Sequence, residues 1–142
     1  MGEKQPQREQ TEYVIVSDVH LTELVFEAEP GWWEHKRFET RQDPALCSFM
    51  RSLERQRPAA FDRTVLIHNG DTFDFDAVFS GPEGKPVPKE GLPADVPGSV
   101  FKMRRILDHH PEWVRELARF LALGNETVFI MGNHDRELSF PE

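Results

Sequence analysis

The sequence predicts an α/β protein built on a parallel sheet of three strands with helices between them. Three apolar runs predict the strands, at residues 12–17, 64–67 and 127–131. The middle run is rich in β-branched residues and does not alternate with polar ones, which is typical of a strand covered on both faces. The order strand, helix, strand, helix, strand favours right-handed crossovers, so the strands would all end at one edge, where ligands bind in such sheets.

The first predicted helix lies between Asp43 and Pro58. Asp43 is a typical capping residue, and Pro44 after it suits the first turn of a helix. Apolar residues then follow at helical spacing on one face: Leu46, Phe49, Met50 and Leu53. Before this helix, residues 21–42 mix tryptophan with many charges and a Pro-Gly pair, which predicts a loop with room for a short helix.

The second helical stretch is predicted between Ser99 and Gly124. Ser99 can cap it, Pro111 would break or restart it, and glycine commonly stands just past a helix end. Residues 80–98, which precede it, are crowded with glycine and proline and predict a surface insertion.

Composition limits the classes of function. The chain has 142 residues, enough for one domain with a core, and a formal net charge of −8. This acidic balance argues against nucleic acid or an anionic membrane surface as a general partner. The single cysteine, Cys47, excludes an internal disulfide, and no run is long and apolar enough to span a bilayer. With no signal-peptide pattern at the start, the default expectation is a cytoplasmic protein.

Each predicted strand is followed at once by residues that can bind a metal. The six residues are Asp18, His20, Asp71, Asp74, Asn133 and His134. They are expected to converge, because parallel strands end at the same edge. Three carboxylates beside two imidazoles and an amide would repel one another or stay unsatisfied, and a divalent metal is the simplest counter-charge. Oxygen ligands mixed with imidazole favour Mn, Fe or Zn over Ca or Cu(I).

Three motifs carry these residues: Asp18-x-His20, Gly70-Asp71-x-x-Asp74 and Gly132-Asn133-His134-Asp135. In type and order they resemble the first three motifs of the calcineurin-like metallophosphoesterases. The resemblance implies a hydrolase in which two metals activate a water that attacks a phosphate ester. It also implies a fold of two packed sheets flanked by helices, of which the three predicted strands would supply part of the first sheet.

The resemblance assigns a role to each site residue. Asp18 and His20 would bind the first metal, Asp71 would bridge both metals, and Asn133 would bind the second. His134 would act as an acid toward the leaving-group oxygen. Asp74 would orient His134.

The sequence also departs from the family pattern. Members of the family carry two later histidine motifs, a single His and a Gly-His-x-His, and neither follows Asp135 here. The resemblance thus covers about the first half of such a domain, with residues 1–11 as a flexible tail and 12–142 as a partial domain. We expect one well-held metal, one weak metal site, and a bare apolar sheet face or edge. A partner chain or a C-terminal half would cover that surface.

Two functions stay open at this level. The first is a metal-dependent phosphoesterase acting on a phosphate mono- or diester, which could be inactive as this shortened chain. The second is a non-catalytic module that retains metal and serves an interaction or structural role. Phe75 stands where the serine/threonine protein phosphatases of the superfamily carry arginine, which argues against a phosphoprotein substrate.

The remaining histidines are interpreted as structural. His68 lies inside the second strand and is expected to be a core residue. His109 and His110 stand at the helix break, where a solvated turn is the simpler interpretation than a metal site. His35 follows a tryptophan pair, which predicts aromatic packing of a loop, with a substrate lid as the alternative.

Overall fold

The structure, a computed structural model, describes residues 10–24, 42–82 and 91–140. The expected packing around His35 lies outside these residues. The strands are β1 (Thr11–Val16), β2 (Arg63–Asn69) and β3 (Glu126–Ile130), the helices α1 (Asp43–Gln56), α2 (Val96–His109) and α3 (Pro111–Ala122), and the short 3-10 helices η2 (Phe75–Ala77) and η4 (Arg136–Ser139). The predicted α/β fold class and the order of its strands and helices are confirmed.

The three strands form one parallel sheet in the order β1-β2-β3. β1 and β2 pair from Thr11 opposite Arg63 to Val16 opposite His68. β2 continues this register into β3, where Asn69 lies opposite Ile130. All three strands therefore run in the same direction and deliver the residues that follow them to one edge, as predicted.

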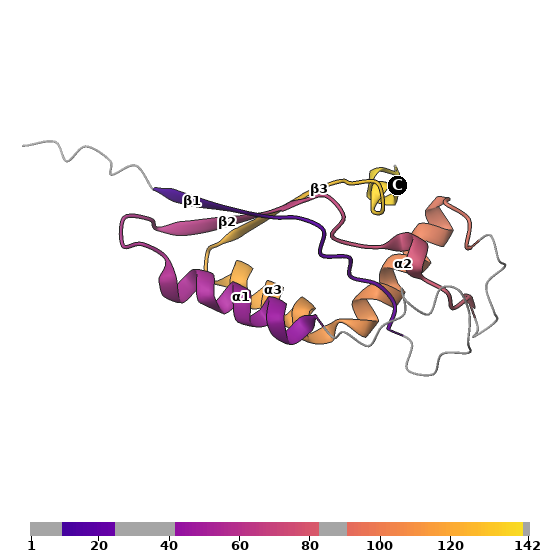
Figure 1. Ribbon diagram of the computed structural model, residues 1–142, viewed down its shortest axis with the longest axis horizontal. Coiled ribbons are helices and arrows are strands. Elements are labelled where there is room, and N and C mark those ends of the chain that lie inside the picture. Colours follow the sequence, from indigo (N-terminus) through magenta and orange to yellow (C-terminus); the bar gives the residue numbers. More distant parts are fainter. Residues whose placement is uncertain (1–9, 25–41, 83–90, 141–142) are drawn as a thin grey trace, which may run out of the picture.

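Helices α1 and α3 cover one face of the sheet, and α2 lies beyond its C-terminal edge (Figure 1). The core between the sheet and the helices is apolar and continuous. Its buried members are Leu21, Met50, Leu66, Phe73, Phe75, Val78, Ile106, Trp113 and Phe120. Burial of this set is the main stabilising contribution to the fold, at about 1.5–3 kcal/mol for each large side chain.

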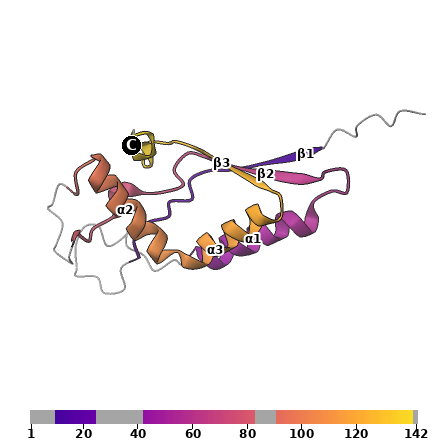
Figure 2. The ribbon, with the colours of Figure 1, turned by 180° about the vertical axis from the view of Figure 1, so that it is seen from behind.

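The opposite face of the sheet is exposed and apolar. No described helix lies on it in either view (Figures 1 and 2). Tyr13 and Ile15 are 67% and 65% exposed, and Val128 and Ile130 across the sheet are also exposed. The register places Ile15, Ile67 and Val128 side by side on this face. A bare apolar face is therefore present among the described residues, as expected, while β2 is buried along most of its length.

The start of α1 differs from the prediction. Asp43 is the first helical residue instead of the cap, and Gln42 occupies the N-cap position without a capping bond from its side chain. The carboxylate of Asp43 is engaged elsewhere: it accepts a hydrogen bond from the backbone N–H of Trp113 at 3.3 Å and lies 2.5 Å from His110 Nδ1. Asp43 therefore pairs with residues far away in the sequence and does not cap α1.

The start of α2 is also corrected, while its break and the end of α3 are confirmed. Asp95 caps α2, accepting a hydrogen bond from the N–H of Gly98 at 2.8 Å, and the helix begins three residues before Ser99. An acid followed by a proline in the first turn is a stronger start signal than the later serine. The two helices separate at Pro111, and Gly124, just past the end of α3, has a φ of +83°.

The interpretation of His109 and His110 as a solvated turn was wrong. His110 is among the fully buried side chains, with Nδ1 facing Asp43 and Nε2 2.8 Å from the carbonyl oxygen of Thr22. His109 Nδ1 accepts a hydrogen bond from the backbone N–H of Leu24 at 2.9 Å. Both rings therefore hold the segment that follows β1 against the helix break. His68, by contrast, is a core residue as predicted.

No helix in the described ranges is of a length and apolarity that would let it cross a membrane.

Candidate metal centre

The turns that follow the three strands are joined to one another by backbone hydrogen bonds. The N–H of Asp18 bonds to the carbonyl of Gly70 at 3.2 Å, and the N–H of His20 bonds to the carbonyl of Asp71 at 2.9 Å. The N–H of Gly70 bonds to the carbonyl of Ile130 at 2.9 Å. We call residues 17–20, 70–74 and 132–135 the C-terminal rim. The predicted motifs thus meet as one structural unit.

Three of the rim residues adopt a backbone conformation that is unusual for residues other than glycine. Asp18, His20 and Asp71 have φ values of 56°, 51° and 51°, in the left-handed region. Each such residue costs about 1–3 kcal/mol, and such strain gathers at functional sites, where surrounding bonds hold it in place. Here the backbone bonds between the turns supply that support.

Gly132 is fixed by its contact with Asp71. A Cβ atom at position 132 would lie 2.2 Å from Asp71 Oδ1 and 2.6 Å from its backbone nitrogen, so no other residue fits without displacing Asp71. Gly70, which has a left-handed conformation with a φ of +82°, lies against the backbone of Gly132. The glycines of the second and third motifs therefore allow the two turns to approach closely.

Asp18, His20 and Asp71 form the first group of candidate ligands. Each offers one ligand atom, and these atoms all lie within 4.8 Å of one another. His20 Nε2 is 4.0 Å from Asp18 Oδ1. Asp18 is exposed, and His20 and Asp71 are half-buried, so the group is open to solvent.

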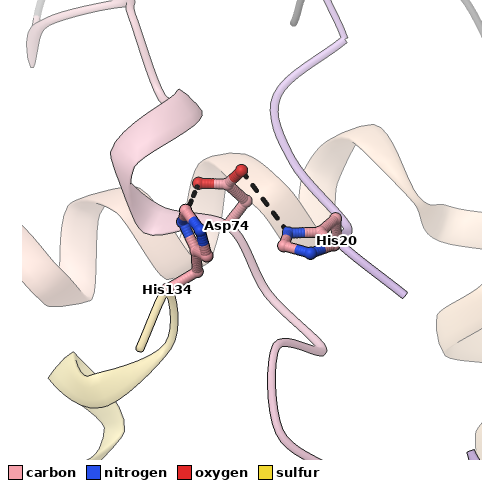
Figure 3. A group of neighbouring side chains, drawn as sticks. All are labelled: His20, Asp74 and His134. Carbon is pink, nitrogen blue, oxygen red and sulfur yellow. Dashed lines mark ion pairs between the residues drawn. The ribbon is translucent and has the colours of Figure 1, made fainter. Parts of the chain in front are cut away.

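His20, Asp74 and His134 form a second group that shares His20 with the first. The carboxylate of Asp74 lies between the two rings (Figure 3), with His20 Nδ1 3.6 Å from one oxygen and His134 Nδ1 3.4 Å from the other. The rings meet edge to face, with centroids 5.0 Å apart. Asp74 Oδ1 and His134 Nδ1 are buried without a hydrogen-bond partner.

These features fit a divalent metal. Two carboxylates and an imidazole supply the hard oxygen and borderline nitrogen donors that Mn, Fe and Zn accept. A metal-bound histidine usually directs its other nitrogen to a carboxylate, and His20 directs Nδ1 to Asp74 while Nε2 faces Asp18. The unpartnered atoms of the second group, Asp74 Oδ1 and His134 Nδ1, face each other at 3.4 Å.

Five of the six residues predicted for the site thus fall into two overlapping groups. Asn133, the sixth, has an exposed side chain and stands in the same turn, between Gly132 and His134. The backbone N–H of His134 donates to Asp71 Oδ1 at 2.9 Å, which ties that turn to the first group.

Asp76 is a residue at the site that the sequence motifs did not predict. Its Oδ2 lies 3.6 Å from His134 Nδ1, on the side of the ring that also faces Asp74, and its side chain is 54% exposed. Asp76 lies in η2, only two residues after Asp74 at the end of the second motif, and this closeness in sequence was the available signal. His134 is therefore flanked by two carboxylates.

Glu23, also missed, anchors the segment that follows the first motif. Its buried carboxylate accepts hydrogen bonds from the backbone N–H groups of Phe79 and Ser80, both at 2.9 Å, and from the guanidinium of Arg105. Burial alone would raise the pKa of Glu23, but the bonds from Ser80, Arg105 and Phe79 together bring it below its ordinary value. Glu23 thus stays charged and joins the segment after the first motif to the residues that follow η2 and to α2.

A parallel sheet that delivers carboxylates and imidazoles to one rim defines an α/β protein with a candidate metal centre. The sequence model of the calcineurin-like phosphoesterase family matches residues 12–142, so the chain belongs to this family. No match was found among curated proteins or among solved structures. Family membership confirms the resemblance carried by the three motifs and makes the chain part of a family of metal-dependent phosphoesterases.

Proposed function

We propose that the chain is a metal-dependent phosphoesterase that hydrolyses a phosphate mono- or diester. One observation carries this proposal: the Asp18, His20 and Asp71 group meets the Asp74 and His134 pair at the C-terminal rim through the shared residue His20. A candidate metal site and a candidate proton donor therefore stand next to each other.

The metal is proposed to be held by Asp18, His20 and Asp71. Asp71 would also reach toward a second and weaker site with Asn133, so one of the two metals typical of the family would be well held by the described residues. When bound, the metal supplies a Lewis acid for the phosphoryl oxygens and lowers the pKa of a bound water. Mn, Fe and Zn are the candidates.

Asp74 and His134 are proposed to handle the proton of the leaving group. Asp74 is buried and faces His134 Nδ1, which leaves Nε2 of the same ring to meet the substrate. A ring held in this way can donate a proton from Nε2 to the departing alkoxide. Without that proton the leaving group would depart as a high-energy anion.

The substrate is proposed to be other than a phosphoprotein. Phe75, which stands where the protein phosphatases of the superfamily have arginine, is buried in the core. It therefore contributes packing where an arginine would contribute charge. A cytoplasmic location is also part of the proposal, and the buried free thiol of Cys47 is compatible with a reducing compartment.

A non-catalytic interaction module is the second candidate, favoured by the exposed apolar face around Tyr13, Ile15 and Val128. Exposed apolar patches of this kind mark interaction surfaces. In this form, residues 12–142 would act as a partial domain, and a partner chain or a C-terminal half of a longer protein would cover the face.

Hydrolysis of a chromogenic phosphodiester in the presence of Mn separates the two functions. The wild-type chain is expected to be active and the Asp71→Asn variant inactive. The Asp62→Asn variant is the matched control, because Asp62 precedes β2 at the opposite end of the sheet, and it should match the wild type. If the wild type and Asp71→Asn are equally inert, the interaction module is the better conclusion.

A further inference from the structure

We propose that Asp135 is a positioning residue that holds Asp71 and His134 in place for the chemistry. The inference rests on the proposed function, which gives Asp71 and His134 their roles. Asp135 has no such role of its own, because its carboxylate is only 1% exposed and both of its oxygens accept hydrogen bonds from the protein.

The two oxygens of Asp135 bind backbone groups from two different turns. Oδ2 accepts a hydrogen bond from the N–H of Thr72 at 2.8 Å, and Oδ1 accepts one from the N–H of Gly132. Thr72 directly follows Asp71, and Gly132 directly precedes Asn133. One buried carboxylate thus joins the turn after β2 to the turn after β3.

Asp71 makes the reciprocal bond. Its Oδ1 accepts a hydrogen bond from the backbone N–H of His134 at 2.9 Å, so each of the two turns provides a carboxylate to the backbone of the other. We call these crossed bonds of Asp71 and Asp135 the carboxylate clamp. The clamp commits one oxygen of Asp71 to the backbone and leaves the other available to a metal.

The clamp explains how the strained backbone of Asp71 is maintained. Its φ of 51° is unfavourable, and the N–H that follows it is held by Asp135. Hydrogen bonds from N–H groups to a charged carboxylate are about twice as strong as those between neutral groups. The bond from Gly132 to Asp135 is local and lies within one turn. The bond from Thr72 to Asp135 spans 63 residues and sets the distance between the two turns.

The Asp135→Asn variant tests the clamp with little change in size. An amide has one oxygen, and its NH₂ group would face one of the two N–H donors, so at least one bond is lost. We expect the affinity for Mn, measured by calorimetry, to fall by about tenfold, the range typical of residues that support metal ligands. The Thr72 and Gly132 amides should exchange with solvent faster, by a similar factor.

Asn125→Ala is the control for a merely structural effect. Asn125 is buried at the opposite end of the sheet, where Oδ1 accepts hydrogen bonds from the N–H of Thr64 at 3.0 Å and from Arg57 at 2.9 Å. Its replacement should lower stability to urea and leave Mn affinity unchanged. An equal loss of Mn affinity in both variants, or no loss in Asp135→Asn, would overturn the proposal.

Hydrogen exchange in the wild-type chain keeps the test decisive if Asp135→Asn fails to fold. Slow exchange at Thr72, Gly132 and His134 would support the clamp, and exchange as fast as in exposed loops would overturn it. A wild-type chain that binds no Mn would count against the proposed function, and the exchange rates would still decide whether the clamp joins the turns.

Discussion

Mild acid is expected to destabilise the fold through His68. The ring is only 3% exposed, stacks on Phe129 with centroids 4.6 Å apart, and has no hydrogen-bond partner at either nitrogen. Burial lowers the pKa of His68 from 6.5 to about 4. Protonating the folded chain therefore requires a much lower pH than protonating the unfolded chain.

The sign and size of the effect follow from that difference. Between pH 6.5 and about 4 the unfolded chain binds a proton at His68 that the folded chain does not, so stability is lost as the pH falls through this window. The loss is about 2 kcal/mol between pH 7 and pH 5 and about 3 kcal/mol by pH 4. A domain of this size is stabilised by only about 5–15 kcal/mol in total.

Urea unfolding followed by circular dichroism between pH 7 and pH 5 measures this loss. The His68→Phe variant is the comparison, because phenylalanine keeps the ring and cannot titrate. The buried carboxylates of Glu23 and Glu116 have pKa values below 4.5 and affect stability at lower pH. The pKa of His109 is also lowered, chiefly by burial, but His109 affects stability equally in the wild type and in His68→Phe. An equal loss of stability between pH 7 and pH 5 in the wild type and in His68→Phe would refute the reasoning for His68.

Two further substitutions have defined outcomes. Gly132→Ala should lower Mn affinity by about tenfold or more in calorimetry, because the new Cβ would meet Asp71 Oδ1 at 2.2 Å. In the control Gly91→Ala the new Cβ has nothing within 4 Å; the φ of +83° strains the alanine and lowers stability, but Mn affinity should stay unchanged. Glu137→Gln should cost about 3–5 kcal/mol in urea unfolding, because it leaves the ammonium of Lys102 buried without a counter-charge, both side chains being 3% exposed.

The control for Glu137→Gln is an exposed ion pair. Arg63 and Glu126 form one on the sheet, with both side chains at least one-third exposed. Glu126→Gln should therefore cost less than about 1 kcal/mol. A similar loss in both variants would show that burial of the Lys102 pair does not govern its contribution.

The sequence was sufficient to predict the sheet and the convergence of its motifs. Strand composition reflects local burial, and the order of strands and helices determines the crossover geometry. Together they were enough to predict that Asp18, Asp71 and His134 lie at one rim. The expected end of α3 was also right, because Gly124 provides a local signal.

What the sequence did not predict depends on contacts between distant segments. The burial of His110 against Asp43 requires the packing of α1 on the α2–α3 break, which no local pattern encodes. The clamp bond from Asp135 to Thr72 likewise spans 63 residues. The start of α2 has a different cause, because Asp95 followed by a proline is a local signal and a stronger one than Ser99.

The most direct test of the metal centre is a calorimetric titration of the chain with Mn. The proposed ligand set predicts one tightly bound equivalent per chain, a second that is weak, and loss of the tight one in Asp71→Asn. Binding that is absent from the wild type, or unchanged in Asp71→Asn, would contradict the assignment of Asp18, His20 and Asp71 as the metal site.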